Sequence, residues 1–164
     1  MKISEKIFKF TLLALIFATL IFIFVQSMLP REVSSAESEA VGGIIEEIFP
    51  SDTPTGAYVQ KNIRKIAHFT EFGVLGVEVA LYVAFFAKRK IFIALSYPAA
   101  LITAFFDESI QIFSKRGPLI TDVWVDFLGF FVFATLTYAV FFTASYLIMR
   151  YNKGKNSNGK NNRS

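Results

Sequence analysis

Four long apolar stretches dominate the chain, at about residues 7–28, 59–86, 91–113 and 122–149. Each is long enough for a transmembrane helix, which needs about 20 predominantly apolar residues. An acidic segment at 29–58, a basic turn at 88–90 and a short turn at 114–121 separate them. The pattern predicts an all-α, polytopic membrane domain over residues 1–149, a four-transmembrane-helix bundle with an extracytoplasmic loop after the first helix. Residues 150–164 are rich in Asn, Lys, Gly and Ser, and we expect them to form a disordered cytoplasmic tail.

The first apolar stretch suits either a signal peptide or a membrane helix, because Lys2, Lys6 and Lys9 precede it. The small residues at 34–36 resemble a cleavage site. However, the stretch is longer than the roughly 7 to 15 residues of a signal-peptide core, and that site lies well beyond its end. We therefore expect the stretch to be retained as a membrane helix.

The acidic segment at 29–58 has a patch of helical periodicity near its centre. Ile44, Ile45, Ile48 and Phe49 recur at helical spacing, opposite the adjacent acid Glu46. This pattern is typical of a short amphipathic helix lying on a membrane surface or across the mouth of a bundle. A partly ordered loop is the alternative.

Composition agrees with a membrane protein and excludes several other classes. Of the 164 residues, 54% are hydrophobic and 20 are phenylalanine, which is too apolar for an ordinary soluble domain. There is no cysteine, which excludes disulfides, thiol catalysis and cysteine-based zinc sites. The net charge of +4 comes from basic residues at segment ends rather than from a basic stripe, so we expect no nucleic-acid partner. The expected partner is the lipid bilayer, and the sequence predicts no particular oligomeric state.

The same basic residues predict the orientation in the cell membrane. Four spans place the lysines and arginines of residues 2–9, 88–90 and 150–163 on one side. The positive-inside rule makes that side the cytoplasm, so both termini are expected there. The acidic loop and the polar ends of the later spans are then extracytoplasmic.

The third stretch contains acids in an unusually apolar setting. Asp107, Glu108 and Gln111 lie in it, and a charge at mid-bilayer costs at least about 3 kcal/mol, so such residues usually face protein or a water-filled cavity. Helical spacing places Asp107 and Gln111 on the same side as Ala104 and opposite Phe105. Glu108 is rotated by about 100° from Asp107, so the two acids cannot both point the same way and one of them could serve a neighbouring helix; the sequence does not show which of the two faces the interior.

Polar residues from three segments are expected to meet at one level near the outer surface. Lys65, His68 and Glu71 follow one another at spacings of three, and Asp122 and Asp126 are four apart, so each set shares a helix face. The predicted topology brings together nine residues: Lys65, His68, Glu71, Asp107, Glu108, Gln111, Arg116, Asp122 and Asp126.

Several motifs resemble those of the VanZ-like family, which is named after a protein associated with teicoplanin resistance. They are residues 65–72 (KIAHFTEF) with 75–76 (LG), 107–111 (DESIQ), Arg116, and 122–129 (DVWVDFLG). Residues 25–27 (VQS) before Pro30 are similar to the polar exit of the family's first span. The resemblance covers roughly residues 10–145 and implies a small polytopic membrane protein linked to glycopeptide susceptibility, without an established reaction. The chain departs from the pattern at Asp126, where the family usually carries Asn, and at Glu78, which lies outside these motifs.

Charge balance at this level suggests what the cluster needs. Five acids face three potential cations, Lys65, His68 and Arg116, so some acids are expected to be protonated or to be balanced by a bound cation. An oxygen-rich set with one histidine makes zinc an unexpected cofactor and favours magnesium, calcium or manganese.

The residues leave several functions open. In an enzyme acting on a lipid-linked substrate, His68 is the general acid or base, with Glu71 and Asp107 or Glu108 as partners. Lys65 and Arg116 then hold a phosphate or carboxylate, Asp122 orients Arg116, and Gln111 and Asp126 complete the ligand-binding set. In a binding protein, the same mouth takes a lipid-linked precursor, a glycopeptide or another membrane protein. The cluster could instead only hold the helices together, or Glu78 could belong to an ion pathway.

Overall fold

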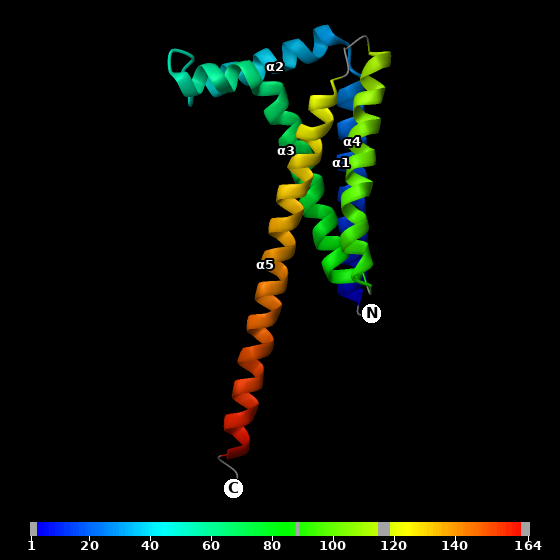
Figure 1. Ribbon diagram of the computed structural model, residues 1–164, viewed down its shortest axis with the longest axis vertical. Helices are drawn as coiled ribbons and strands as arrows, with labels where there is room; N and C mark the ends of the chain where they lie inside the picture. The colour runs from blue at the N-terminus through cyan, green and yellow to red at the C-terminus, as the bar shows by residue number, and fades with distance from the viewer. Residues whose placement is uncertain (1–2, 88, 115–118, 162–164) are drawn as a thin grey trace.

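The computed structural model describes residues 3–87, 89–114 and 119–161 (Figure 1). The described chain forms five helices and contains no strand: α1 (Ile3–Met28), α2 (Arg31–Glu46), α3 (Pro54–Phe86), α4 (Ile91–Phe113) and α5 (Ile120–Asn161). Helices α1, α3 and α4 and the part of α5 up to Lys153 are long and apolar enough to cross a membrane. The prediction of an all-α, four-span membrane protein is therefore confirmed.

The four long helices form a bundle that α2 crosses at one end (Figure 1). Both termini lie at the other end, and the last part of α5 extends beyond the rest of the bundle. We call the end that α2 crosses the α2 end.

The segment expected as a loop at 29–58 is largely helical. Helix α2 occupies its first part, and the amide of Gln60 on α3 ties α2 down by donating to the Gly42 carbonyl at 2.9 Å and to Glu46 at 3.1 Å. Glu46 also accepts hydrogen bonds from the backbone N–H and the hydroxyl of Ser51, and these lower the pKa of its carboxyl. This segment is therefore helical, but over a different range from the predicted short helix: α2 includes Ile44 and Ile45 and ends at Glu46, before Ile48 and Phe49.

Local signals explain where α3 begins. Thr53 caps it by accepting a hydrogen bond from the Gly56 N–H at 3.0 Å, and Pro54 occupies the first turn. Proline suits that turn because its fixed φ is helical and the missing N–H has no partner there in any helix. The helix therefore starts at Pro54, five residues before the predicted boundary.

The C-terminal segment differs from the expected disordered tail, because α5 continues to Asn161. Starting a helix is the costly step, whereas each added residue contributes one more backbone hydrogen bond. The membrane-spanning part of α5 supplies that start. The polar residues after Met149 therefore extend an existing helix and need no nucleus of their own.

The face of α4 that was predicted to point inward is buried. Ala100, Ala104 and Asp107 are buried, whereas Phe105 and Phe106 are exposed by 63% and 57%. Exposed phenylalanines suit contact with lipid, because lipid tails solvate apolar groups. The bundle thus turns its small and polar side inward.

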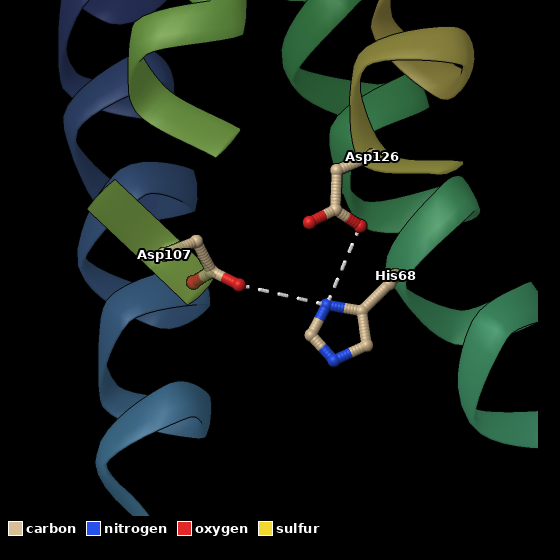
Figure 2. A group of neighbouring side chains, drawn as sticks. All are labelled: His68, Asp107 and Asp126. Atoms are coloured by element: carbon tan, nitrogen blue, oxygen red, sulfur yellow. Dashed lines mark ion pairs between the residues drawn. The ribbon is translucent and has the colours of Figure 1, made fainter. Parts of the chain in front are cut away.

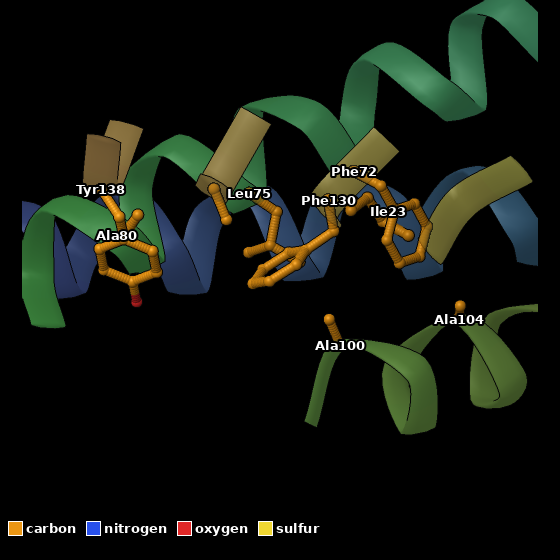
Figure 3. Close-up of a cluster of buried hydrophobic side chains, with 9 residues drawn as sticks. Ile23, Phe72, Leu75, Ala80, Ala100, Ala104, Phe130 and Tyr138 are labelled. Carbon is orange, nitrogen blue, oxygen red and sulfur yellow. The ribbon is translucent and has the colours of Figure 1, made fainter. Parts of the chain in front are cut away.

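The core is built around a close crossing of α3 and α5. Phe72 and Leu75 from α3 pack with Phe130 and Ala134 from α5, joined by Ile23 from α1 (Figure 3). Glycines permit this approach: a Cβ at Gly76 would lie 2.7 Å from the Phe130 carbonyl oxygen, and one at Gly129 would overlap the carbonyl of Phe69. Small residues at crossings are the usual means of close helix packing in membranes.

We expect Gly76→Ala and Gly129→Ala each to destabilise the bundle by about 1–3 kcal/mol, because the new methyl meets backbone that cannot turn aside. The matched control is Gly43→Ala in α2, where a Cβ meets nothing within 4 Å. Alanine favours helix over glycine by up to about 1 kcal/mol, so the control should be neutral or stabilising. Thermal unfolding in detergent measures the difference, and equal melting temperatures for all three variants would contradict the close crossing.

Candidate functional site

Three helices bring His68, Asp107 and Asp126 together inside the bundle near the α2 end. His68 comes from α3, Asp107 from α4 and Asp126 from α5, and both carboxylates point toward the imidazole (Figure 2). The Nδ1 atom of His68 lies 3.8 Å from Oδ2 of Asp107 and 3.6 Å from Oδ1 of Asp126. Both acid side chains are 0% exposed and that of His68 is 13% exposed. We call these three residues the His68 triad.

Asp107 is held in place from α1. The Ser27 hydroxyl donates to Oδ1 of Asp107 at 2.6 Å, and both residues are fully buried. The Gln111 amide lies 3.5 Å from the other carboxylate oxygen, Oδ2. Sequence reasoning placed Ser27 only in the polar exit of the first span, because spacing within one helix does not show which side chain on another helix it meets.

Glu108 shares Gln111 with Asp107 but has a second partner of its own. It accepts from the Gln111 amide at 2.6 Å and from the backbone N–H of Leu119, just before α5, at 3.0 Å. Glu108 is 4% exposed, so both adjacent acids are buried. Asp107 faces His68 within the triad, while Glu108 ties the end of α4 to the residue just before α5.

A cavity of about 380 Å³ opens beside the triad. Three basic side chains of α3 line it, together with polar residues from α4 and α5; the lining residues are Lys61, Asn62, Arg64, Lys65, His68, Gln111, Leu119, Asp122, Val125 and Asp126. Lys65 is 46% exposed and pairs with Asp122 at 3.4 Å, and Arg64 donates to the Gln111 side-chain oxygen at 2.9 Å. The lysines are exposed, His68 is less exposed and Asp126 is buried, so the entrance of the cavity is basic and its buried end is acidic.

The structure brings most of the predicted site residues to this region. Lys65, His68, Gln111, Asp122 and Asp126 line the cavity. Asp107 and Glu108 are buried next to it through the contacts given above. Glu71 lies one turn beyond His68 on α3, partly buried, and is not part of the lining. Arg116 lies outside the described residues.

Sequence reasoning missed five lining residues: the polar Lys61, Asn62 and Arg64 and the apolar Leu119 and Val125. A signal was present, because Lys61 and Arg64 precede His68 by seven and four residues and so fall on its helix face. Glu78 is separate from the cavity. Its carboxylate accepts from the Thr19 hydroxyl at 3.1 Å, and it lies about 15 Å along α3 from His68.

The arrangement can bind charge of either sign. Arginine and lysine at the entrance suit a phosphate or carboxylate, which guanidinium groups bind through paired hydrogen bonds. The imidazole between two carboxylates suits a proton or a cation. One ligand that carries both kinds of charge could use the whole cavity.

Comparison with protein families finds a match to the family described as VanZ/LLP1 over residues 10–144, which is most of the chain. The family resemblance seen in the motifs is therefore confirmed. No curated protein and no solved structure matches the chain.

We expect Ser27→Ala to destabilise the bundle by about 1–3 kcal/mol, because it leaves a buried carboxylate oxygen of Asp107 without its donor. The control is Thr70→Ala, whose hydroxyl bonds only to the Ile66 carbonyl of its own helix, and it should change little. In the Asp107→Asn background the Ser27 substitution should cost less, since the two residues share one interaction. Detergent unfolding of the four variants measures this coupling, and strictly additive losses would contradict the contact.

Proposed function

The chain belongs to the VanZ/LLP1 family, and on that premise we propose that it is a multi-pass cell-membrane protein that binds the anionic head group of a lipid-linked cell-envelope ligand. The head group enters the cavity beside the His68 triad, and the ligand's apolar chain stays in the bilayer. Binding of this kind accounts for a polar cavity in an otherwise lipid-facing bundle.

The cavity faces the extracytoplasmic side in this proposal. The basic turn with Arg89 and Lys90, the lysines of α1 and those at the end of α5 all belong to the end opposite α2 (Figure 1). The positive-inside rule makes that end cytoplasmic. The α2 end then meets ligands that have already crossed the membrane.

The observation that carries the proposal is the basic entrance of the cavity. Lys61, Arg64 and Lys65 lie within five residues of one another on α3, and all three line it. Each positive charge favours a phosphate, and the partly buried Arg64 offers the paired donors that a phosphate accepts. A neutral or cationic ligand has no use for such an entrance.

The proposal extends to glycopeptide susceptibility. The family takes its name from a protein associated with teicoplanin resistance, and an envelope precursor held in this cavity is less accessible to agents that act on the outer surface. Deletion of the protein should therefore change susceptibility to teicoplanin more than to agents that act inside the cell.

Catalysis on the same ligand is a second candidate. His68 directs Nδ1 toward two carboxylates and its other ring nitrogen away from them (Figure 2). Acids placed in this way orient an imidazole and raise its ability to accept a proton, as in a general base. The enzyme candidate requires His68 to titrate, whereas the binding candidate requires only its shape and hydrogen bonding.

We expect Arg64→Gln to weaken binding of farnesyl diphosphate, a short lipid diphosphate, by roughly tenfold, because a charged hydrogen bond contributes about 1.5–3 kcal/mol. Farnesol, which has no diphosphate, should bind weakly to both proteins. Lys153→Gln, which removes a positive charge about 40 Å along α5 from Asp126, is the control and should bind as the wild type does. Titration calorimetry in detergent measures these affinities, and equal affinity for Arg64→Gln and Lys153→Gln would contradict the proposed entrance.

In cells, we expect Arg64→Gln, Asp107→Asn and the gene deletion to change teicoplanin susceptibility alike, at matched membrane abundance of the two variants. His68→Gln separates the two candidates, since glutamine keeps hydrogen bonding and loses titration: it should spare a binding function and abolish a catalytic one. Variants that disappear from the membrane, or that are present and behave as wild type, would instead assign the cluster to holding the bundle together.

A further inference from the structure

We propose that the His68 triad is a binding site for a divalent cation, Mg²⁺ or Mn²⁺, with one ligand from each of α3, α4 and α5. The ligand atoms are Nδ1 of His68 and one carboxylate oxygen each of Asp107 and Asp126, and all three lie within 4.8 Å of one another. The site is independent of the lipid-linked ligand proposed above.

The distances in the triad are too long for direct hydrogen bonds and leave room for an ion between the three ligand atoms. The His68 nitrogen lies 3.6 Å from Asp126 and 3.8 Å from Asp107. An N–H···O hydrogen bond needs about 2.7–3.2 Å. Ligands about 2.1 Å from one octahedral metal ion lie about 3.0 Å apart at neighbouring positions, so an ion bound here would draw each carboxylate about 0.6–0.8 Å closer to the imidazole.

Asp126 supplies the second, independent observation. Its side chain is 0% exposed, and neither carboxylate oxygen accepts a hydrogen bond from any residue in the described part of the chain. The carboxylate points at the imidazole of His68 (Figure 2). A buried carboxylate without donors is costly, and coordination to a cation is one of the two ways in which proteins satisfy it.

Charge balance also favours a divalent ion. Within the described residues no lysine or arginine pairs with Asp126: Lys65 contacts Asp122, and Arg64 contacts Gln111. Two carboxylates and a neutral imidazole match a doubly charged cation. Protonation of His68 supplies one positive charge, but at these distances it gives no close hydrogen bond to either acid.

The ligands are held as metal ligands usually are, by contacts of their own. Ser27 donates to Oδ1 of Asp107 at 2.6 Å, which leaves Oδ2 directed at His68. Support of this kind orients a ligand and lowers the cost of assembling the site. Because three different helices supply the ligands, an ion bound here also joins them.

Ligand chemistry decides which ion fits. Two carboxylate oxygens and a single imidazole form a mostly hard set, which favours Mg²⁺ or Mn²⁺ over softer ions. An octahedral ion with three protein ligands keeps about three further positions for water or ligand oxygens. His68 and Asp126 line the cavity, so those positions open into it.

The chain contains a single histidine, which provides a probe that needs no substitution. The protein is labelled with ¹³C at the histidine Cε1, purified with a tag that lacks histidine, and titrated with Mn²⁺ in maltoside micelles. We expect the single histidine NMR signal to broaden saturably at one equivalent, since a paramagnetic ion bound to Nδ1 lies next to Cε1. Excess Mg²⁺ should restore the signal. A signal that stays sharp through several equivalents of Mn²⁺ would overturn the site.

Two substitutions assign the ligands. Asp126→Asn keeps the shape of the side chain but removes its charge, and it should abolish the saturable broadening. The control is Glu78→Gln, because Glu78 is a partly buried acid on the same helix as His68 and bonds to Thr19; this variant should keep the broadening. If the histidine signal of folded Asp126→Asn broadens at the same Mn²⁺ concentrations as that of the wild type, the site is also overturned. If that variant does not fold, the wild-type titration decides alone. Because Mn²⁺ is the only ligand added, the result is separate from that of the farnesyl diphosphate experiment.

Discussion

Buried carboxylates need partners inside the protein, and at the α2 end this requirement links four helices. Asp107, Glu108 and Asp126 are buried in surroundings that offer little solvation. Asp107 takes its donor from α1, Glu108 takes one from the residue before α5, and Asp126 faces the histidine of α3. Since each acid depends on a helix other than its own, the polar interior assembles only when the helices are correctly registered.

The glycine crossing of α3 and α5 sets the distances in this polar interior. Gly129 lies three residues after Asp126 and contacts the backbone of Phe69, which follows His68 directly. The closest approach of the two helices therefore falls next to the pair of side chains that must meet. The helix packing and the polar site therefore depend on neighbouring residues, because a wider crossing would separate the His68 imidazole from the Asp126 carboxylate.

Much of this arrangement could be predicted from sequence, because its causes are local. The lengths of the apolar stretches predicted the four spans, and helical spacing correctly placed Asp107 with Ala104, but spacing did not show which of Asp107 and Glu108 faces the interior. Contacts between helices could not be predicted, since a pattern such as Lys61, Arg64 and His68 shows a shared face but not what that face meets. The role of Ser27 depends on the rotation of α1 against α4, which its own sequence does not encode. The extent of α5 was missed for a different reason: composition describes a polar segment in isolation, whereas an existing helix lowers the cost of adding to it.

The long α5 helix connects two places that are otherwise unrelated. Asp126 lies in its second turn, while Lys153 lies about 40 Å farther along the same axis. The last part of α5 extends past the other helices (Figure 1). An α-helix resists bending over such lengths, so a tilt at one end is reproduced at the other. A tilt of about 5° about the crossing would move the far end by roughly 3 Å, from the helix rise alone. The part of α5 beyond the bundle therefore moves with any tilt of the helix at its crossing with α3.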